Sequence, residues 1–338
     1  MSAASTDIGE TDVCVIGARR FEIRDMRVQD MAEVLTLFGH VFGQSPGPDW
    51  FAWKYGRGGG TAVGVRDESL RLIAHYAGFP RSLLWMGEVV RAIQIGDVMV
   101  APELRGILTR RGPFFQACRR FFGSQVGAGR PQELAFGFPN ERHQRLGVAL
   151  DLYLDAGPIH ALRWTAQSQG LPRWWHWSEL DVSDSRTDAE IDVAWAAMAA
   201  IMGNAVIGAR PSGYVRWRFI DRPDRRYRLF RLRRHWSRQA AGIAVLRTEA
   251  DTAVWLDWIG PPQPMRMAAR ALAAEAHRAG VPELTAWVSP AVAEVLAGSG
   301  AVTDGTAAWL AVAKCSTPTP EAIAAARWWL MGGDTDFL

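Results

Sequence analysis

The segment from Gln94 to Gly112 has the residue types and order that could bind a phosphorylated ligand. Its apolar first half predicts a strand, Pro102 predicts a turn, and Pro113 favours the start of a helix. In such a segment, main-chain N–H groups of the loop and of the helix N-terminus point outward together and can bind a pyrophosphate. Glycine lets the backbone approach the phosphate, and three arginines could add charge-assisted hydrogen bonds: Arg105, Arg110 and Arg111. The alternative is an ordinary structural turn.

Hydrophobic periodicity predicts the elements that position this segment. Alternation over Phe21–Arg24 indicates a strand, and apolar residues at helical spacing over Val28–Phe42 indicate a helix. The first half has further predicted strands at residues 61–66, 71–79, 88–100 and 134–138, and a helix from residue 113. The second half has predicted helices at 188–202, 265–279, 291–296 and 321–330, and strands at 227–233, 241–247, 253–259, 284–288 and 307–313. Both halves place strands before one helix and a final strand, which predicts a duplicated α/β fold with a mixed sheet.

Length and composition agree with two globular domains. The chain has 338 residues, more than a single core usually supports, with 49% hydrophobic and 22% charged residues. The predicted units are a leader (1–20), a first domain (21–158), a connector (159–205), a second domain (206–315) and a C-terminal helix and tail (316–338).

Cysteine usage and hydropathy predict a cytoplasmic protein without a structural metal. Cys14, Cys118 and Cys315 are odd in number and widely separated, which predicts neither a disulfide framework nor a metal site. No secretory signal is recognisable, and no run of about eighteen apolar residues could span a bilayer. A net charge of only +3 does not favour nucleic acid. We therefore expect no membrane and no nucleic-acid partner, and make no prediction of the oligomeric state.

The strand and loop over Val98–Gly106 resemble the pyrophosphate-binding segment of the GNAT superfamily of acetyltransferases. The resemblance continues in Phe136–Asn140, which is similar to the fifth strand of that fold and its following asparagine. It extends weakly to Ser212–Arg218 and to the terminal Gly-Asp-Thr-Asp, which are similar to two-domain bacterial members. One departure is Leu108, where the family expects a glycine.

This resemblance implies two GNAT-like domains in tandem, with acetyl-CoA bound by the first. The implied function is N-acyl transfer, most simply N-acetyl transfer, to a small amine such as an amino sugar or an amino acid derivative. The implied cofactor contacts are Val98, Met99, Val100, Arg105, Gly106, Ile107, Leu108, Thr109, Arg110, Arg111, Gly112 and Asn140. In the second copy, prolines at 261, 262 and 264 remove N–H donors, so we expect no coenzyme A there.

Acyl transfer to an amine needs a base, and four residues are candidates. Asp97 lies within the key strand, where a carboxylate is costly unless it is paired or functional. His75 and Tyr76 are consecutive on a strand, so only one can face the cleft. In some two-domain relatives the chain end reaches the active site, which makes Leu338 the fourth candidate. The structural alternatives are an ion pair for Asp97, a core position for His75 and a frayed tail.

Two other functions remain open at this point. The altered loop could belong to a GNAT-like binding module without catalysis. The arginine-rich segment 225–234 could bind nucleic acid, although its alternation with apolar residues favours a half-buried strand. The tryptophans at 174, 175 and 177 could stack on a sugar or a base, or could pack a domain seam.

Overall fold

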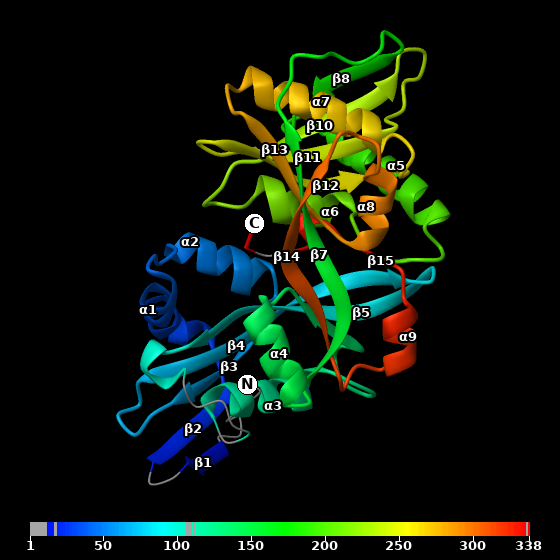
Figure 1. Cartoon of the computed structure of the whole chain (residues 1–338). Helices are drawn as coiled ribbons and strands as arrows, with labels where there is room; N and C mark the ends of the chain where they lie inside the picture. The colour runs from blue at the N-terminus through cyan, green and yellow to red at the C-terminus, as the bar shows by residue number, and fades with distance from the viewer. Residues whose placement is uncertain (1–11, 17–18, 106–109, 111, 336) are drawn as a thin grey trace, which may run out of the picture.

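The computed structural model describes residues 12–16, 19–105, 110, 112–335 and 337–338. In this part of the chain the strands form one continuous mixed sheet, with helices packed along it (Figure 1). The strand order is β1-β2-β3-β4-β5-β6-β14-β7-β13-β12-β11-β10-β8. The predicted mixed α/β fold class is confirmed.

The first half of the chain supplies one end of this sheet. Its strands are β1 (Asp12–Ile16), β2 (Arg19–Asp25), β3 (Thr61–Arg66), β4 (Leu72–Trp85), β5 (Glu88–Val100), β6 (Leu134–Gly137) and β7 (Tyr153–Thr165). Its helical segments are η1 (Val28–Asp30), α1 (Met31–Phe42), α2 (Pro48–Phe51), η2 (Ala52–Arg57), η3 (Pro102–Leu104), α3 (Pro113–Gln125) and α4 (Glu141–Ala149).

The second half supplies the other end. Its strands are β8 (Trp175–Glu179), β9 (Val206–Gly208), β10 (Arg228–Arg234), β11 (Gly242–Thr248), β12 (Thr252–Ile259), β13 (Glu283–Val288), β14 (Val302–Ala313) and β15 (Trp328–Trp329). Its helical segments are α5 (Arg186–Ile201), α6 (Ser212–Val215), η4 (Arg216–Ile220), α7 (Met265–Arg278), α8 (Pro290–Leu296), α9 (Pro320–Ala325) and η5 (Gly332–Asp334).

The two halves repeat the same order of elements. With β9, η1 and η3 set aside, the series β2, α1, α2–η2, β3, β4, β5, α3, β6, α4, β7 corresponds to β8, α5, α6–η4, β10, β11, β12, α7, β13, α8, β14. Both series contain a short α-helix that continues as a π-helical turn, η2 in the first and η4 in the second. The structure thus has the tandem arrangement that the sequence predicted.

The halves exchange their last strands. β14, from the end of the second series, lies between β6 and β7 and pairs with both. β7, from the end of the first series, pairs with β13. The sheet therefore has no break at the predicted boundary at residue 158, because β7 crosses it. The segment expected to be a connector forms β8 and α5 of the second half.

A pair of tryptophans joins the two π-helical turns. The Trp53 indole Nε1 donates to the Trp217 carbonyl oxygen at 2.6 Å, and the Trp217 Nε1 donates to the Trp53 carbonyl oxygen at 3.1 Å. The two rings stack with centroids 5.1 Å apart. Near them, Arg57 forms an ion pair with Asp221. These reciprocal contacts relate the halves by an approximate two-fold axis.

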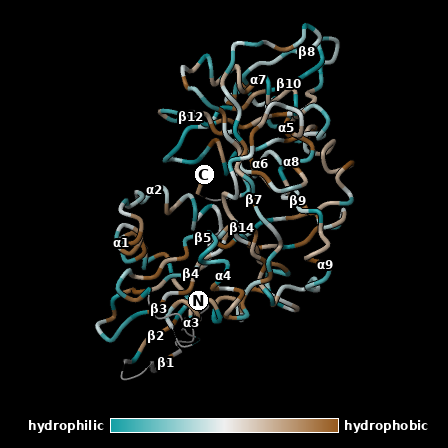
Figure 2. Tube along the Cα trace, viewed as in Figure 1, coloured by the Kyte–Doolittle hydropathy of each residue, from teal (hydrophilic) through white to brown (hydrophobic). Residues whose placement is uncertain are grey.

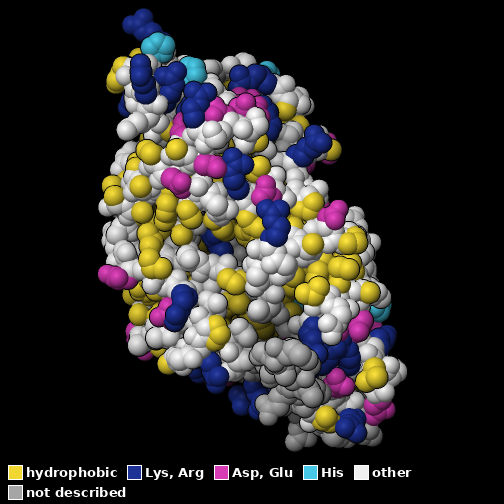
Figure 3. Space-filling view, turned by 180° about the vertical axis from the view of Figure 1, so that it is seen from behind, with side chains coloured by type: hydrophobic (Ala, Val, Ile, Leu, Met, Phe, Trp, Pro, Cys, Tyr) yellow, Lys and Arg dark blue, Asp and Glu magenta, His cyan; other side chains and the backbone are white. Residues whose placement is uncertain are grey.

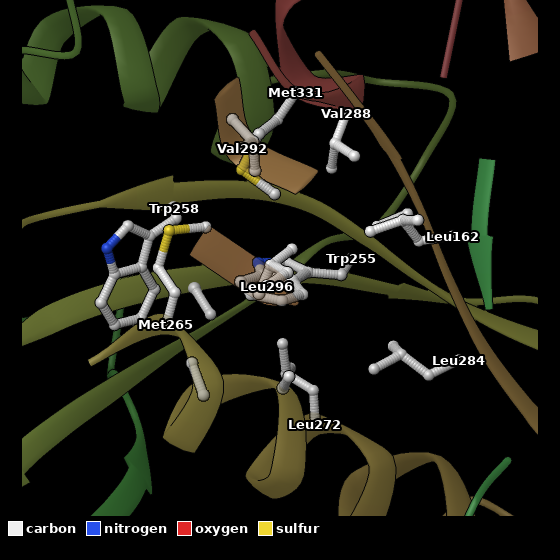
Figure 4. Packing of buried hydrophobic residues seen from close by; sticks show 14 of the residues in the cluster. Leu162, Trp255, Trp258, Met265, Leu272, Leu284, Val288, Val292, Leu296 and Met331 are labelled. Atoms are coloured by element: carbon white, nitrogen blue, oxygen red, sulfur yellow. The ribbon is translucent and has the colours of Figure 1, made fainter. Parts of the chain in front are cut away.

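The hydrophobic core follows the sheet through both halves. Many of the hydrophobic stretches in Figure 2 lie in the strands, and the loops at the ends are more hydrophilic. In the second half, Trp255 lies at the centre of a cluster with Leu272 and Leu284 (Figure 4). Each large apolar side chain that is fully buried contributes about 1.5–3 kcal/mol to folding.

The C-terminal tail fills a split in the second half of the sheet. β12 pairs with β13 only over Thr252–Val254, and the two strands then separate. η5 packs against both strands in this split, and Met331 forms a bridge with Val288. The fit is close at Gly333, where an added Cβ would lie 2.9 Å from the Asp257 Cβ. The tail therefore packs closely into this split.

A buried network of charges holds the tail. The Asp334 carboxylate accepts hydrogen bonds from Arg81 of β4 at 2.9 Å and from Arg210 at 2.6 Å. Arg210 also donates to Asp257 of β12 at 2.9 Å. The side chains of all four residues are at most 2% exposed. Burial raises the pKa of Asp257 in spite of the attraction by Arg210.

Two predicted elements differ in the structure. The helix predicted at 321–330 ends at Ala325, and Trp328–Trp329 form β15 instead. These two residues pair with β9, so tertiary pairing and burial override their helical spacing. The strand predicted at 71–79 continues to Trp85, where it pairs with β9.

We predict that Asp334→Asn lowers the free energy of unfolding by about 3–5 kcal/mol, because it breaks a buried ion pair and leaves arginine charge uncompensated. Denaturant unfolding of the full chain measures this change. As the control, Glu294→Gln removes an exposed ion pair with Arg327 and should cost less than about 1 kcal/mol. Equal, small losses of unfolding free energy in both variants would show that the buried network contributes no more to stability than an exposed ion pair.

Candidate functional site

The first half has a split in the corresponding place, and here it is open. β5 pairs in parallel with β6 only from Ala92 to Ile95, and the strands then separate. At the same point β5 carries a bulge opposite β4, and Asp97 adopts a positive φ of 47°. A left-handed conformation is costly for a residue other than glycine and is typically retained for a structural or functional reason. The bulge turns the backbone of β5 away from the sheet ladder at the mouth of the split.

A cavity of about 510 Å³, here called the inner cavity, occupies the split. Its floor includes Tyr76 of β4 and Tyr153 of β7, and its side includes Gly96 and Asp97 of β5. Much of the remaining wall is aromatic or aliphatic, from Phe38, Phe42, Phe114, Phe122, Phe136, Phe138, Trp287 and Phe337. Four alanines of β14 complete it: Ala307, Ala308, Ala311 and Ala313. The second half therefore contributes directly to this cavity.

A second cavity of about 670 Å³, the outer cavity, adjoins the first. Three arginines line it: Arg105, Arg142 and Arg145. The two cavities share Phe42, Val98, Phe114, Asn140 and His143 in their walls. The two cavities therefore adjoin and are together called the passage, which is lined by arginines in its outer part and is largely apolar in its inner part.

Asp97 is paired in the structure. Lys54 Nζ donates to its carboxylate at 2.6 Å, and the Tyr55 hydroxyl donates to the other oxygen at 2.6 Å. Lys54 is itself buried, over the rings of Trp50 and Phe79. Asp97 nevertheless lines the inner cavity. Sequence reasoning missed Lys54 and Tyr55, because it did not place η2 against the bulge.

His75 and Tyr76 lie on opposite faces of β4. Tyr76 lines the inner cavity, whereas His75 is in the wall of neither cavity. The His75 Nδ1 is 2.8 Å from the Asp97 carbonyl oxygen, so this nitrogen carries the proton. Among the described residues its Nε2 is buried without a hydrogen-bond partner, and burial lowers the pKa of His75. This placement favours a structural role for His75 at the bulge.

Tyr76 belongs to a small polar cluster under the inner cavity. Its hydroxyl is 2.9 Å from the hydroxyl of Tyr153. Burial raises the pKa of both tyrosines, with Cys118 as a further cause, so both phenols are protonated at neutral pH. Gly147 of α4 makes room for the second ring, because an added Cβ there would lie 1.9 Å from the Tyr153 side chain. Tyr153 was not among the predicted site residues, since β7 itself was not predicted.

His143 lies at the junction of the two cavities. Its ring stacks on Phe114 of α3, with centroids 5.7 Å apart. Its main-chain N–H donates to the Asn140 side chain at 3.0 Å, which caps α4. Burial, together with the charges of Arg142 and Arg105, lowers the pKa of His143. His143 was not among the site residues predicted from the sequence.

The predicted cofactor contacts divide into three groups. Val98, Val100, Arg105 and Asn140 line the cavities, and Arg105 also donates weakly to the Val100 and Val41 carbonyl oxygens. Met99 is buried on the other side of the strand, Arg110 is exposed, and Gly112 caps α3. The remaining five lie outside the described residues: Gly106, Ile107, Leu108, Thr109 and Arg111.

The end of the described chain lies beside the inner cavity. Phe337 lines the cavity and packs against Trp287. The main-chain oxygen of Leu338 accepts hydrogen bonds from three side chains: Arg218, Arg222 and Tyr227. Leu338 is thus anchored next to the cavity wall, and its catalytic role stays a prediction.

Metal chemistry finds no support in the described part of the chain, which contains no group of three or more His, Cys, Asp or Glu residues arranged to hold an ion. None of the described helices is long and apolar enough to cross a bilayer.

Residues 22–143 match the family model "Acetyltransferase (GNAT) domain". This match lies in the first half of the chain, from β2 into α4. This match covers the bulge, the split between β5 and β6, and the cavity-lining residues up to His143. A comparison with the sequences of curated proteins finds no match.

Several solved structures share the fold across both halves. A probable N-acyltransferase from Enterococcus faecalis V583 has 15% identity and a TM-score of 0.62, covering 86% of this chain and 71% of that one. A GCN5-related N-acetyltransferase from Anabaena variabilis has 14% identity and a TM-score of 0.64, with 87% and 72% covered. Saccharomyces cerevisiae N-myristoyltransferase with bound myristoyl-CoA has 10% identity and a TM-score of 0.55, with 93% and 86% covered. The fold of these structures thus extends over most of this chain.

We predict that Arg142→Gln raises the pKa of His143, because it removes a nearby positive charge that disfavours the imidazolium. Titration of the His143 ring signals by NMR measures the shift. Arg145→Gln, on the same helix, is the matched control and should leave this pKa nearly unchanged. If neither variant moves it, the charge of Arg142 does not contribute to the lowered pKa of His143.

Proposed function

We propose that this protein transfers an acyl group from a coenzyme A thioester to the amino group of a small molecule, with acetyl-CoA as the donor. The observation that carries the proposal is the continuous passage through the open split of β5 and β6, inside the GNAT domain. The passage is basic where phosphates would bind and apolar where the acyl group would react.

The outer cavity suits the phosphorylated end of the donor. Arg105, Arg142 and Arg145 offer guanidinium groups to phosphates, which they can bind in a bidentate manner. The inner part suits a flexible arm of mixed polarity, because Val98 and Phe114 give apolar walls and Asn140 gives an amide. When bound, the thioester supplies the activated acyl group.

The exposed edge of β5 would stabilise the reacting carbonyl. Beyond Ile95 the main chain of β5 has no β6 partner, and Gly96, Asp97 and Val98 face the inner cavity. Main-chain N–H groups fixed in this way can bind the oxyanion that forms when an amine attacks a thioester. The bulge holds these groups in place before the reaction, which avoids reorganisation during it.

Two groups of side chains would handle the protons. The Asp97 carboxylate lines the cavity and attracts an ammonium group, and it can take a proton from the attacking amine. Lys54 and Tyr55 fix its position. On the other side, the linked hydroxyls of Tyr76 and Tyr153 are proton donors for the departing thiolate.

The acceptor would enter from the side formed by both halves. Trp287 and Phe337 from the second half line the inner cavity together with Gln44 and Asp97 from the first. Aromatic faces beside a carboxylate and an amide suit a small polar ring or chain that carries an amine. An amino sugar or an amino acid derivative has this character.

The direct test measures release of free thiol from acetyl-CoA with a panel of amino sugars and amino acid derivatives, alongside longer acyl-CoA donors. We expect thiol release that depends on the amine. Tyr76→Phe should lower kcat by about 100-fold or more while KM changes little, because general acid catalysis contributes that much. Binding of acetyl-CoA without thiol release for any amine would instead indicate a binding module, and no binding at all would refute the proposal.

We predict that Arg105→Ala weakens coenzyme A binding roughly 10- to 100-fold, which is the loss expected for one charge-assisted hydrogen bond. Isothermal titration calorimetry measures the affinity and should give one site per chain, because the tail fills the second split. Arg71→Ala is the matched control: Arg71 is exposed near the same loop but pairs with Glu103 and lines neither cavity. Equal affinities in both variants would remove Arg105 from the site.

A further inference from the structure

The far end of the second half carries a cluster of arginine, histidine and tryptophan side chains that acyl transfer does not use. β8 is the last strand of the sheet, and its first residues pair with the end of β10, Arg233 with His176 and Arg234 with Trp175. The chain after β10 turns back over them, and the His235 N–H donates to the Trp174 carbonyl oxygen at 2.8 Å. We call this cluster the tip: Arg173, Trp174, Trp175, His176, Arg233, Arg234, His235, Trp236 and Arg238.

The tip projects from the molecule at the end opposite to the first half. In Figure 1, β8 and its adjoining loops lie at the top, well above the helices α1 and α4 that flank the passage. Figure 3 shows basic and histidine side chains gathered at the upper corner, where the surface protrudes. A ligand bound at the tip would leave the passage open.

The charge of the tip is positive and uncompensated. Its four arginines form no ion pair with any described residue; Arg233, for example, donates to the Ser237 carbonyl oxygen. Neither segment 166–178 nor segment 231–241 contains an acidic residue. Elsewhere many arginines are paired, as Arg228 is with Glu179 and Arg231 with Glu190. With a net charge of +3 for the whole chain, this concentration at one end is a distinct feature.

Exposed tryptophans accompany the charge. Trp236 is 74% exposed and Trp174 is 47% exposed, which is unusual for such large apolar side chains. The Arg234 guanidinium lies 3.9 Å above the Trp175 ring and 5.8 Å from that of Trp236, so it holds the aromatic groups together. Tryptophan combined with arginine is the pairing favoured where protein meets the headgroups of a bilayer, since the indole is apolar with one polar N–H.

We propose that the tip docks on the surface of an anionic lipid bilayer. Arginines near such a surface are attracted by its negative potential, and the exposed indoles enter the headgroup layer. A projecting tip fits a flat surface, whereas single-stranded nucleic acid is typically bound in a groove that follows its backbone. This proposal revises the expectation, made from the sequence, that the protein has no membrane partner. The absence of a spanning helix among the described residues concerns insertion and does not bear on surface binding.

The test is co-sedimentation of the full chain with vesicles. We expect binding to vesicles of phosphatidylcholine mixed with phosphatidylglycerol and little binding to phosphatidylcholine alone. Added salt should weaken the binding, because it screens the charges. The double variant Arg173→Gln/Arg238→Gln should reduce affinity for anionic vesicles about tenfold or more. Trp174→Ala/Trp236→Ala should reduce it while leaving the net charge unchanged.

The control variant is Arg91→Gln, which removes an exposed arginine of the first half, paired with Glu133. It changes the net charge like one tip substitution and should leave vesicle binding nearly intact. Circular dichroism and thermal unfolding verify that each variant is folded. Binding that is equal for neutral and anionic vesicles, binding lost equally in Arg91→Gln, or no binding would overturn the proposal. Tip-dependent binding of a single-stranded oligonucleotide without vesicle binding would also overturn it, and would assign nucleic acid instead.

Discussion

The contact between Asp334 and the two arginines, Arg81 and Arg210, is the interaction on which the arrangement of this molecule depends. It ties the tail to β4 of the first half and, through Asp257, to β12 of the second. Charges buried so completely are stable only when each one is paired. The free energy lost when one partner is removed is much larger than the net stabilisation that the network provides. The network therefore mainly specifies the position of the tail and adds little net stability. Only one position of the tail satisfies all four groups.

The fixed position of the tail explains why two similar halves have different roles. Each half separates its two central parallel strands, β5 from β6 and β12 from β13. In the second half the tail fills the gap and supplies the acid that neutralises Arg210. Among the residues that the structure describes, no comparable segment enters the gap of the first half, which continues into both cavities. The chain uses its own terminal segment to close one ligand-sized split, and the same segment then brings Phe337 to the wall of the other.

The exchange of β7 and β14 has a related consequence for the site. Because β14 lies between β6 and β7, four of its alanines line the inner cavity, and their small side chains leave that space open. The first half alone would lack this wall. The two halves thus form a single site. In the proposed function, the first half binds the acyl-CoA donor, and the second half bounds the region assigned to the acceptor amine.

Local pattern in the sequence was enough to predict the elements that define the split. The strand over Glu88–Val100 and the helix beginning at Pro113 have the predicted bounds, since alternation and a proline start are properties of neighbouring residues. β7 and β15 escaped prediction because their conformation depends on partners far away in sequence. Dependence on distant partners also explains which site residues could be predicted and which could not. Asp97 and Tyr76 lie on a recognisable strand, whereas Lys54 and Tyr153 reach the site only through tertiary packing.

The bulge at Asp97 shows how local strain and function are joined in this fold. A regular β5 would continue its ladder and direct its main-chain groups into neighbouring strands. The positive φ of Asp97 breaks that register. Three contacts to Asp97 offset its conformational strain: Lys54 and Tyr55 bind the carboxylate, and His75 donates to the carbonyl oxygen. His75 therefore has a clear physical task without touching the cavity. Its proton fixes the carbonyl on one side, so that the opposite edge of the strand remains turned toward the passage. His75, one of the four candidate bases from the sequence, thus serves to hold the backbone on which the proposed chemistry depends.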